Sequence, residues 1–248
     1  MRNRVIIKAE ARRRIQQGHV SPILATAVVL VICFVLDRVV DLVEGGSLFA
    51  TYHYDWAYFQ AVASGNVDSI QAVLDMVPQA TVLSLSLSVA VSLFTTVLNG
   101  GYYLFCMDIL HGREASLSTL MDGLGFAGRL IWCNILVAVK VALWSMLFFF
   151  PGLIAAYRYR FAVYNVLTDP DLSAGQAIAL SCEQTQGIKG ELFMLDLSFI
   201  GWNLLSSLTM GLLNLWVAPY MALCDLSYFE DARQRLGGGG WADGPNWQ

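Results

Sequence analysis

Six polar residues, five of them ionisable, lie within or next to long apolar stretches of the chain: Lys140, Arg158, Arg160, Asp196, Asn214 and Asp225. An ionisable side chain at the centre of a membrane-spanning helix costs roughly 2.5–3.5 kcal/mol, so it is normally paired or marks an ion or substrate pathway. These six residues are the candidate intramembrane polar site of this sequence.

Their depths predict which of them meet. At a rise of about 1.5 Å per residue, Arg160 lies some 10 Å from the inner boundary of its predicted span, and Asp196 and Asp225 lie about 6–8 Å from it. We therefore predict that Arg160 or Arg158 pairs with Asp196 or Asp225. Such pairs either fix the order of the helices or belong to a substrate or ion site. Lys140, near the middle of its span, has no partner at its depth.

No catalytic or metal-binding motif accompanies these residues. The carboxylates of 169–171 and 225–231 are not near a histidine, and there is neither a phosphate-binding glycine loop nor a G-x-S-x-G sequence. The three histidines and five cysteines are scattered, without a C-x-x-C pair. We expect no enzymatic activity, no metal, no cofactor and no nucleic-acid partner.

The apolar stretches define the class of the protein. Residues 76–107 and 197–224 contain no charged residue over 32 and 28 positions, and about 20 apolar residues are enough to cross a bilayer as a helix. The mean hydropathy is +0.56 and only 14% of residues are charged, against about 25% in soluble domains. The sequence predicts an all-α, polytopic transmembrane helical bundle.

We expect about six spans, within a range of four to six. Residues 1–231 form a single integral membrane domain in this prediction, and 168–190 form a connector in which Ser173 caps a helix over 174–186. The predicted order is a basic cytoplasmic helix (1–17), an external acidic and aromatic loop (37–77), a flexible cytoplasmic tail (232–248), and spans at about 20–36, 79–104, 130–150, 153–167, 191–208 and 211–229. Whether 130–167 forms two spans or one kinked span stays open.

Charge predicts the orientation. Six cations precede the first span, whereas the segment after it is acidic. Cytoplasmic flanks collect Lys and Arg, so both termini are expected in the cytoplasm and 37–77 outside. The first span also has the outline of a signal peptide, and we interpret it as a retained signal anchor.

Small residues recur at every fourth position of the second span: Ala80, Ser84, Ser88, Ser92, Thr96 and Gly100. Small side chains at this spacing allow another helix to approach closely, so the stripe predicts helix packing. A hydroxyl-lined pore face is the alternative. Helix breaks are predicted at Pro151-Gly152, as a tight turn or a kink, and at Pro219.

The C-terminal half resembles a known family. The segments that carry the resemblance are 195–202, 208–211 and 215–220, together with Pro151-Gly152, 157–164, 228–231 and Gly18-His19. They are similar to the bacterial integral membrane family called domain of unknown function 975, well over 130–231 and loosely elsewhere. The resemblance implies a multi-pass protein of the bacterial cytoplasmic membrane and implies no reaction. The chain departs from the family where Ala155-Ala156 replace a common lysine, and in the length of 37–77.

Two functions remain open. The first is a non-enzymatic structural, assembly or regulatory membrane component, in contact with the lipid bilayer and with other membrane proteins or further copies of itself. The second is a small transporter or permease-like protein with a polar site near the breaks at Pro151-Gly152 and Pro219, since interrupted helices often surround such sites. A membrane enzyme acting on lipids ranks third.

Overall fold

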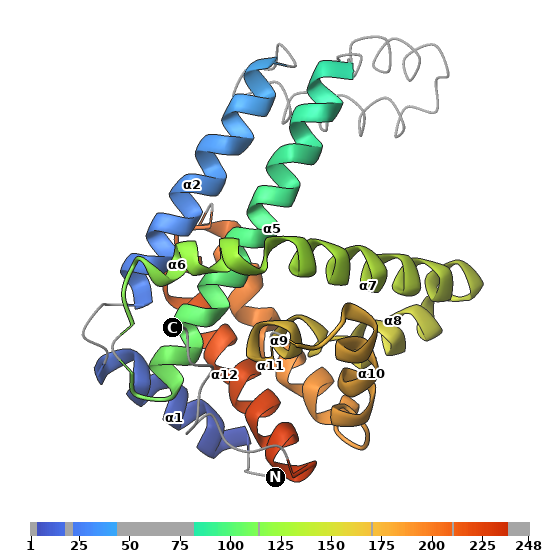
Figure 1. Cartoon of the computed structure of the whole chain (residues 1–248). Helices are drawn as coiled ribbons and strands as arrows, with labels where there is room; N and C mark the ends of the chain where they lie inside the picture. Colours follow the sequence, from blue (N-terminus) through green and yellow to red (C-terminus); the bar gives the residue numbers. More distant parts are fainter. Residues whose placement is uncertain are drawn as a thin grey trace, which may run out of the picture. The chain divides into compact units, whose positions relative to one another are not determined.

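The computed structural model describes the chain in six stretches, and every regular element in them is a helix (Figure 1). The all-α prediction is therefore confirmed for these residues. The chain forms two compact units, residues 1–29 with 96–248 and residues 30–95. The described stretches are residues 4–17, 22–43, 82–113, 115–169, 171–209 and 211–237. Ala80 and most of the predicted external loop, 44–77, lie outside them.

The smaller unit contains the C-terminal part of α2 (Pro22–Val43) and the N-terminal part of α5 (Val82–Leu110). Helix α2 continues past residue 36, the predicted end of the first span. It includes Arg38 and Asp41, whose side chains form an ion pair at 2.7 Å one turn apart. Because Arg38 and Asp41 neutralise each other, the apolar helix can continue through them. The first part of the predicted external loop, 37–43, is therefore helical.

Within the stretches that the structure describes, three helices are long and apolar enough to cross a membrane: α2, α5 and the nearly continuous helix Thr119–Leu147. The last comprises α6 (Thr119–Asp122), the 3₁₀ helix η1 (Gly123–Phe126) and α7 (Ala127–Leu147). These three correspond to the first three of the six predicted spans. Helices α11 and α12, described below, are not among them.

Glycines bring α5 and η1 into close contact within the larger unit. A Cβ on Gly123 would lie 2.6 Å from the Val97 carbonyl oxygen and 2.5 Å from the Gly101 nitrogen, and a Cβ on Gly101 would overlap the Leu120 carbonyl. One member of the predicted stripe, Gly100, also lies at a tight contact, against Leu130 of α7. The closest approach of these backbones therefore depends on Gly101 and Gly123, which are not members of the stripe.

Helices α7 and α8 (Phe149–Arg158) form a hairpin. The chain reverses at Phe148, which is extended with φ −162° and ψ 153°. Pro151 lies in the first turn of α8, where its missing N–H has no intrahelical role. Gly152 packs against Ser145, since a Cβ there would lie 2.8 Å from the Ser145 Cα. The predicted break at Pro151-Gly152 thus falls at Phe148, and it separates two helices.

The predicted fourth span, 153–167, is wrong as a continuous helix. Helix α8 ends at Arg158, and α9 (Ala162–Thr168) begins after a three-residue turn. A helix of 10 residues covers only about 15 Å, half the thickness of the hydrocarbon core. The next helix, α10 (Ala174–Gln184), has Ser173 as its N-cap, as predicted. Ser173 and Gln176 form a capping box there.

Helices α11 (Lys189–Leu208) and α12 (Asn214–Arg235) are joined by a turn in which Gly211 has φ +84°. The predicted break at Pro219 is wrong, because α12 continues through it. Proline removes one donor, and only the Leu215 carbonyl loses its intrahelical partner. The predicted tail also begins too early, since α12 includes Ala232, which is 1% exposed. The tail from 238 onward lies outside the described residues.

Helix α1 (Arg4–Gln17) packs along α12. Ile7 and Ala11 are fully buried in this contact. The Lys8 ammonium lies 4.7 Å from the Phe199 ring centre and donates a hydrogen bond to the Ser198 hydroxyl at 2.7 Å. The basic N-terminal helix is therefore part of the larger unit, with Lys8 and Arg12 against aromatic rings.

The glycine contact between α5 and η1 predicts a position-specific loss of stability. Gly123→Ala places a methyl group against backbone atoms that cannot move aside, and overpacking of this kind costs about 1–3 kcal/mol. We expect a lower midpoint of thermal unfolding in detergent. Gly125→Ala is the matched control in the same 3₁₀ helix, because nothing lies within 4 Å of its Cβ position. Equal midpoints for the two variants would contradict the close approach.

Candidate functional site

The turn between α8 and α9 positions Arg160. The polar backbone groups at the two ends of this turn are buried, but they have hydrogen-bond partners because α10 supplies them. The Ser181 hydroxyl donates to the Arg158 carbonyl at 2.9 Å and accepts from the Phe161 N–H at 3.1 Å, and the Thr185 hydroxyl also donates to the Arg158 carbonyl. Ser181 thus bridges both ends of the interruption. A helix can be interrupted away from water only where such partners exist.

A buried amide pair holds α9 against α10. The Asn165 and Gln184 side chains each donate to the other's carbonyl oxygen at 2.9 Å, and Asn165 also donates to the Ala177 carbonyl at 3.1 Å. Both residues are 2% exposed. Buried polar networks with every group paired are rigid. The turn that carries Arg160 is therefore anchored on the α10 side.

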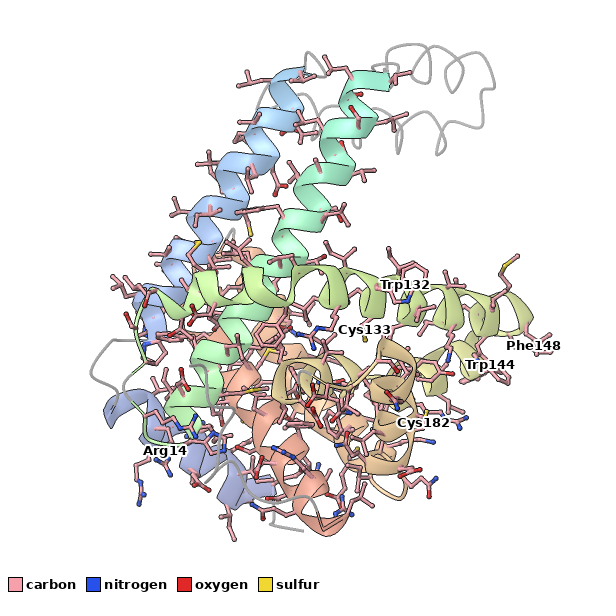
Figure 2. All side chains as sticks on the ribbon, viewed as in Figure 1. Arg14, Trp132, Cys133, Trp144, Phe148 and Cys182 are labelled. Carbon is pink, nitrogen blue, oxygen red and sulfur yellow. The ribbon has the colours of Figure 1, made fainter. Side chains whose placement is uncertain are left out.

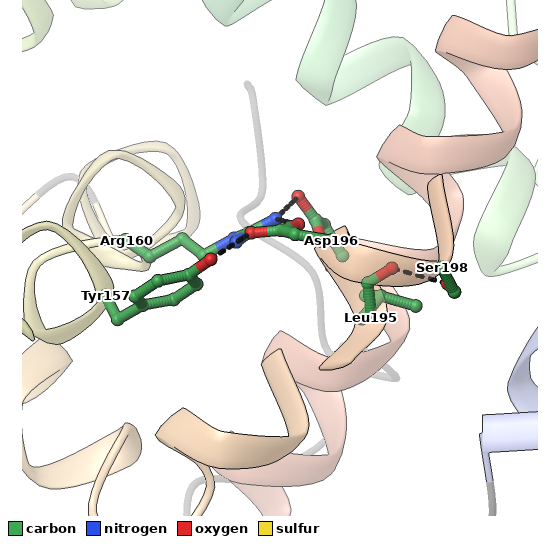
Figure 3. Close-up of polar contacts among 6 residues, drawn as sticks. Tyr157, Arg160, Leu195, Asp196 and Ser198 are labelled. Atoms are coloured by element: carbon green, nitrogen blue, oxygen red, sulfur yellow. Dashed lines mark hydrogen bonds and ion pairs between the residues drawn. The ribbon is translucent and has the colours of Figure 1, made fainter. Parts of the chain in front are cut away.

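Arg160 forms ion pairs with two carboxylates at once. Its guanidinium donates to both oxygens of Asp196, at 2.6 and 2.9 Å, and from Nη2 to both oxygens of Asp225, at 2.7 and 2.8 Å. The Tyr157 hydroxyl adds a hydrogen bond to Asp196 at 2.7 Å. Figure 3 shows Tyr157 and Arg160 converging on Asp196. We call Tyr157, Arg160, Asp196 and Asp225 the Arg160 cluster.

The cluster is partly shielded from solvent. The side chains of Arg160, Asp196 and Asp225 are 20%, 33% and 17% exposed. Bidentate arginine–carboxylate bonds are the strongest and most directional ion pairs in proteins. One cation between two anions leaves a formal charge of −1, so the cluster attracts a cation or hydrogen-bond donors. It ties together the α8–α9 turn, α11 and α12.

A polar cavity adjoins the cluster, with Arg160 in its wall. Its volume is about 200 Å³, enough to hold several waters or a small solute. The rings of Tyr103 and Tyr164 meet edge to face at 5.1 Å in this region. The residues that line the cavity are Thr96, Asn99, Tyr103, Asn134, Arg160, Val163 and Tyr164. They come from α5, α7, the α8–α9 turn and α9.

The other three predicted site residues lie apart from the cluster. The Lys140 ammonium lies 5.7 Å from the centre of the Tyr159 ring, a cation–π contact that supplies the partner its depth did not reveal. The Arg158 side chain is exposed. Asn214 accepts a hydrogen bond from the Ser206 hydroxyl at 2.6 Å, at the turn between α11 and α12. The structure thus brings together Arg160, Asp196 and Asp225.

Several residues of this region had no distinct signal in the sequence. Tyr157 and Ser181 are ordinary polar residues until the turn is known. Asn99 and Tyr103 are four residues apart on α5, and this helical spacing is the only trace of the cavity in the sequence. Among the residues that the structure describes, no group of three or more His, Cys, Asp or Glu could hold a metal ion.

The region that contains the Arg160 cluster matches a known protein family. Residues 150–236 match the family described as "Protein of unknown function (DUF975)". This agrees with the resemblance seen in the sequence, and the matched region runs from α8 to the end of α12. Arg160, Asp196 and Asp225 all lie within it. No curated protein and no solved structure matches the chain.

The geometry predicts that Asp225 is needed for stability. Asp225→Asn removes one of the two anions paired with Arg160. Breaking a buried pair from one side costs up to about 3–5 kcal/mol when the other charge is left unpaired, and less here because Arg160 keeps Asp196. We expect a lower unfolding midpoint for Asp225→Asn and a smaller decrease for Asp196→Asn, because Asp196 is more exposed. Asp171→Asn, on an exposed residue, is the control. If all three variants unfolded like the wild type, the cluster would have no structural role.

Proposed function

We propose that the protein is a non-enzymatic, multi-pass component of the bacterial cytoplasmic membrane with a structural, assembly or regulatory role. The observation that carries this proposal is the exposure of its apolar helices. Only 17%, 17% and 11% of the residues in the most apolar windows of α2, α5 and Thr119–Leu147 are buried by the rest of the chain. Surfaces this apolar need lipid or the helices of other membrane proteins around them.

The proposed orientation has both termini in the cytoplasm, with α2 crossing outward and α5 returning. The basic residues before α2 and the acidic residues after it favour this direction. The contact of α1 with α12 supports the cytoplasmic C-terminus. If α12 crossed the bilayer, Lys8 and Arg12 beside it would enter the hydrocarbon at roughly 2.5–3.5 kcal/mol each. We therefore propose fewer crossings than the six predicted from the sequence.

In this topology the α7–α8 hairpin enters the bilayer and returns without α8 crossing it. Its tip is strongly apolar, and Met146, Phe148 and Phe150 are 85%, 71% and 73% exposed. Figure 2 shows Trp144 and Phe148 at the far end of α7. Exposed aromatic and aliphatic side chains in this number are stable in lipid and unfavourable in water.

The assembly role predicts a specific effect of the small-residue stripe on α5. Ser88 is half-buried, its hydroxyl bonded to the Ser84 carbonyl of its own helix, and Ser92 is exposed. Ser88→Leu and Ser92→Leu should prevent close helix approach and reduce recovery of protein partners or further copies, measured by native mass spectrometry after gentle extraction. Ser86→Leu, off the stripe on the same helix, is the control. Unchanged recovery in the stripe variants would remove the support that the stripe gives to an assembly role.

Transport is the second candidate, and the polar cavity favours it. A cavity lined by amides and hydroxyls beside an interrupted helix is the arrangement in which transporters hold small polar substrates. The net negative charge of the cluster favours cations, although Arg160 is the cluster member that lines the cavity, and the amides favour neutral hydrogen-bonding solutes. Lys140 and Asn214, which the sequence assigned to this site, do not line the cavity.

Transport through this cavity predicts uptake into proteoliposomes, with potassium ions and urea as the two probes. Asn99→Leu fills the polar wall with an apolar side chain and should reduce uptake to the level of protein-free vesicles. Asn203→Leu, an exposed asparagine of α11, should leave uptake unchanged. Wild-type protein that transports neither probe above protein-free vesicles would exclude this candidate for both solute classes.

A further inference from the structure

An apolar groove lies at the C-terminal end of α1, away from the Arg160 cluster. Its volume is about 280 Å³. Two tryptophans in its wall, Trp202 and Trp216, are 46% and 57% exposed. The main lining residues are Arg12, Ile15, Ile23, Trp202, Trp216 and Tyr220. The groove thus joins α1, the first turn of α2, α11 and the start of α12, all within the larger unit.

One end of this groove is basic. Among the residues that the structure describes, Arg12 is the only charged one that lines it, and no carboxylate does. The Arg12 guanidinium lies 5.4 Å from the centre of the Tyr220 ring. The Tyr220 hydroxyl is buried, and Arg12 is the polar side chain that interacts with it. A guanidinium beside a hydroxyl is suited to an anionic oxygen group such as a phosphate.

We propose that the groove binds an anionic phospholipid, with an acyl chain along Trp202 and Trp216 and the phosphate at Arg12. The apolar wall suits the acyl chain of the lipid, and the positive charge of Arg12 suits its anionic headgroup. Tryptophan is also enriched at the boundary between headgroups and hydrocarbon. A soluble phosphate ion would use Arg12 but would leave the apolar wall uncovered.

The leaflet follows from the position of Ile23. This residue is the second of α2, which in the proposed orientation starts at the cytoplasmic face. The lipid therefore belongs to the cytoplasmic leaflet, whose anionic lipids attract basic segments near the surface. Only this assignment of the leaflet rests on the proposed function. Binding itself depends on the groove alone, so it can be measured on purified protein in detergent.

The test is lipid retention by native mass spectrometry of the full-length protein, with phosphatidylglycerol and phosphatidylcholine added in turn. We expect wild-type protein to retain phosphatidylglycerol in preference to phosphatidylcholine. Arg12→Gln should weaken phosphatidylglycerol binding about five-fold, the effect of one cation near an anionic headgroup. Arg13→Gln is the matched control, because it removes the same charge from the neighbouring, exposed position outside the groove.

Equal losses in Arg12→Gln and Arg13→Gln would overturn the proposal, since they would indicate a non-specific response to charge. Retention of phosphatidylcholine at the level of phosphatidylglycerol would overturn it as well. Glycerol 3-phosphate is a further probe, because it has the phosphate but no acyl chain. If it bound as tightly as the lipid, the apolar groove would have no role in binding. Labelling of single cysteines from either side of the membrane tests the orientation separately, so a wrong leaflet and an absent site give different results.

Discussion

Arg160 holds three parts of the chain together, because its guanidinium meets carboxylates from two different helices. It projects from the turn between α8 and α9, and it reaches Asp196 of α11 and Asp225 of α12 at distances between 2.6 and 2.9 Å. A planar guanidinium with five donors can bind two carboxylates in this way, whereas a lysine ammonium presents a single point charge. The arrangement of α8, α9, α11 and α12 depends on this contact.

The helices around the turn keep the arginine in place. Ser181 satisfies the backbone on both sides of the turn, and the amide pair of Asn165 and Gln184 joins α9 to α10. A charged cluster in partly buried surroundings is favourable only when each member is paired, because desolvation of an isolated charge costs several kcal/mol. The structural role of the cluster and the polar cavity beside it are compatible. The groups that lock the helices carry one excess negative charge, and Arg160 is the member of the cluster that lines the cavity.

The sequence predicted those features that depend on local pattern or on depth. The helical class follows from the apolar runs, the N-cap of α10 from the residue type of Ser173, and the pairing of Arg160 from the similar depths of three ionisable residues. The helix breaks were not predicted at the right residues, because the effect of a proline on a helix depends on its position in it. Pro151 fits the first turn of α8 without disturbing it, and Pro219 removes only one hydrogen bond from α12.

Other features could not be read from the sequence because they arise from contacts between distant segments. Nothing local reveals that Lys140 stacks on Tyr159 or that Ser181 completes the turn around Arg160. Packing of α1 along α12 was missed for the same reason. The six cations before α2 dominate the pattern of that segment, and the two residues that dock it, Ile7 and Ala11, are inconspicuous among them.

A double-mutant cycle between Arg160 and Asp225 tests the central claim most directly. Unfolding free energies in detergent would be measured for wild type, Arg160→Met, Asp225→Leu and the double variant. Arg160→Met leaves Asp225 without its cation, and Asp225→Leu leaves Arg160 paired with Asp196 alone. If the ion pair joins the α8–α9 turn to α12, the double variant should lose less stability than the two singles together. We expect a coupling energy of about 1–3 kcal/mol, within the range for residues in contact. Additive losses would contradict the account, because the two side chains would then contribute independently.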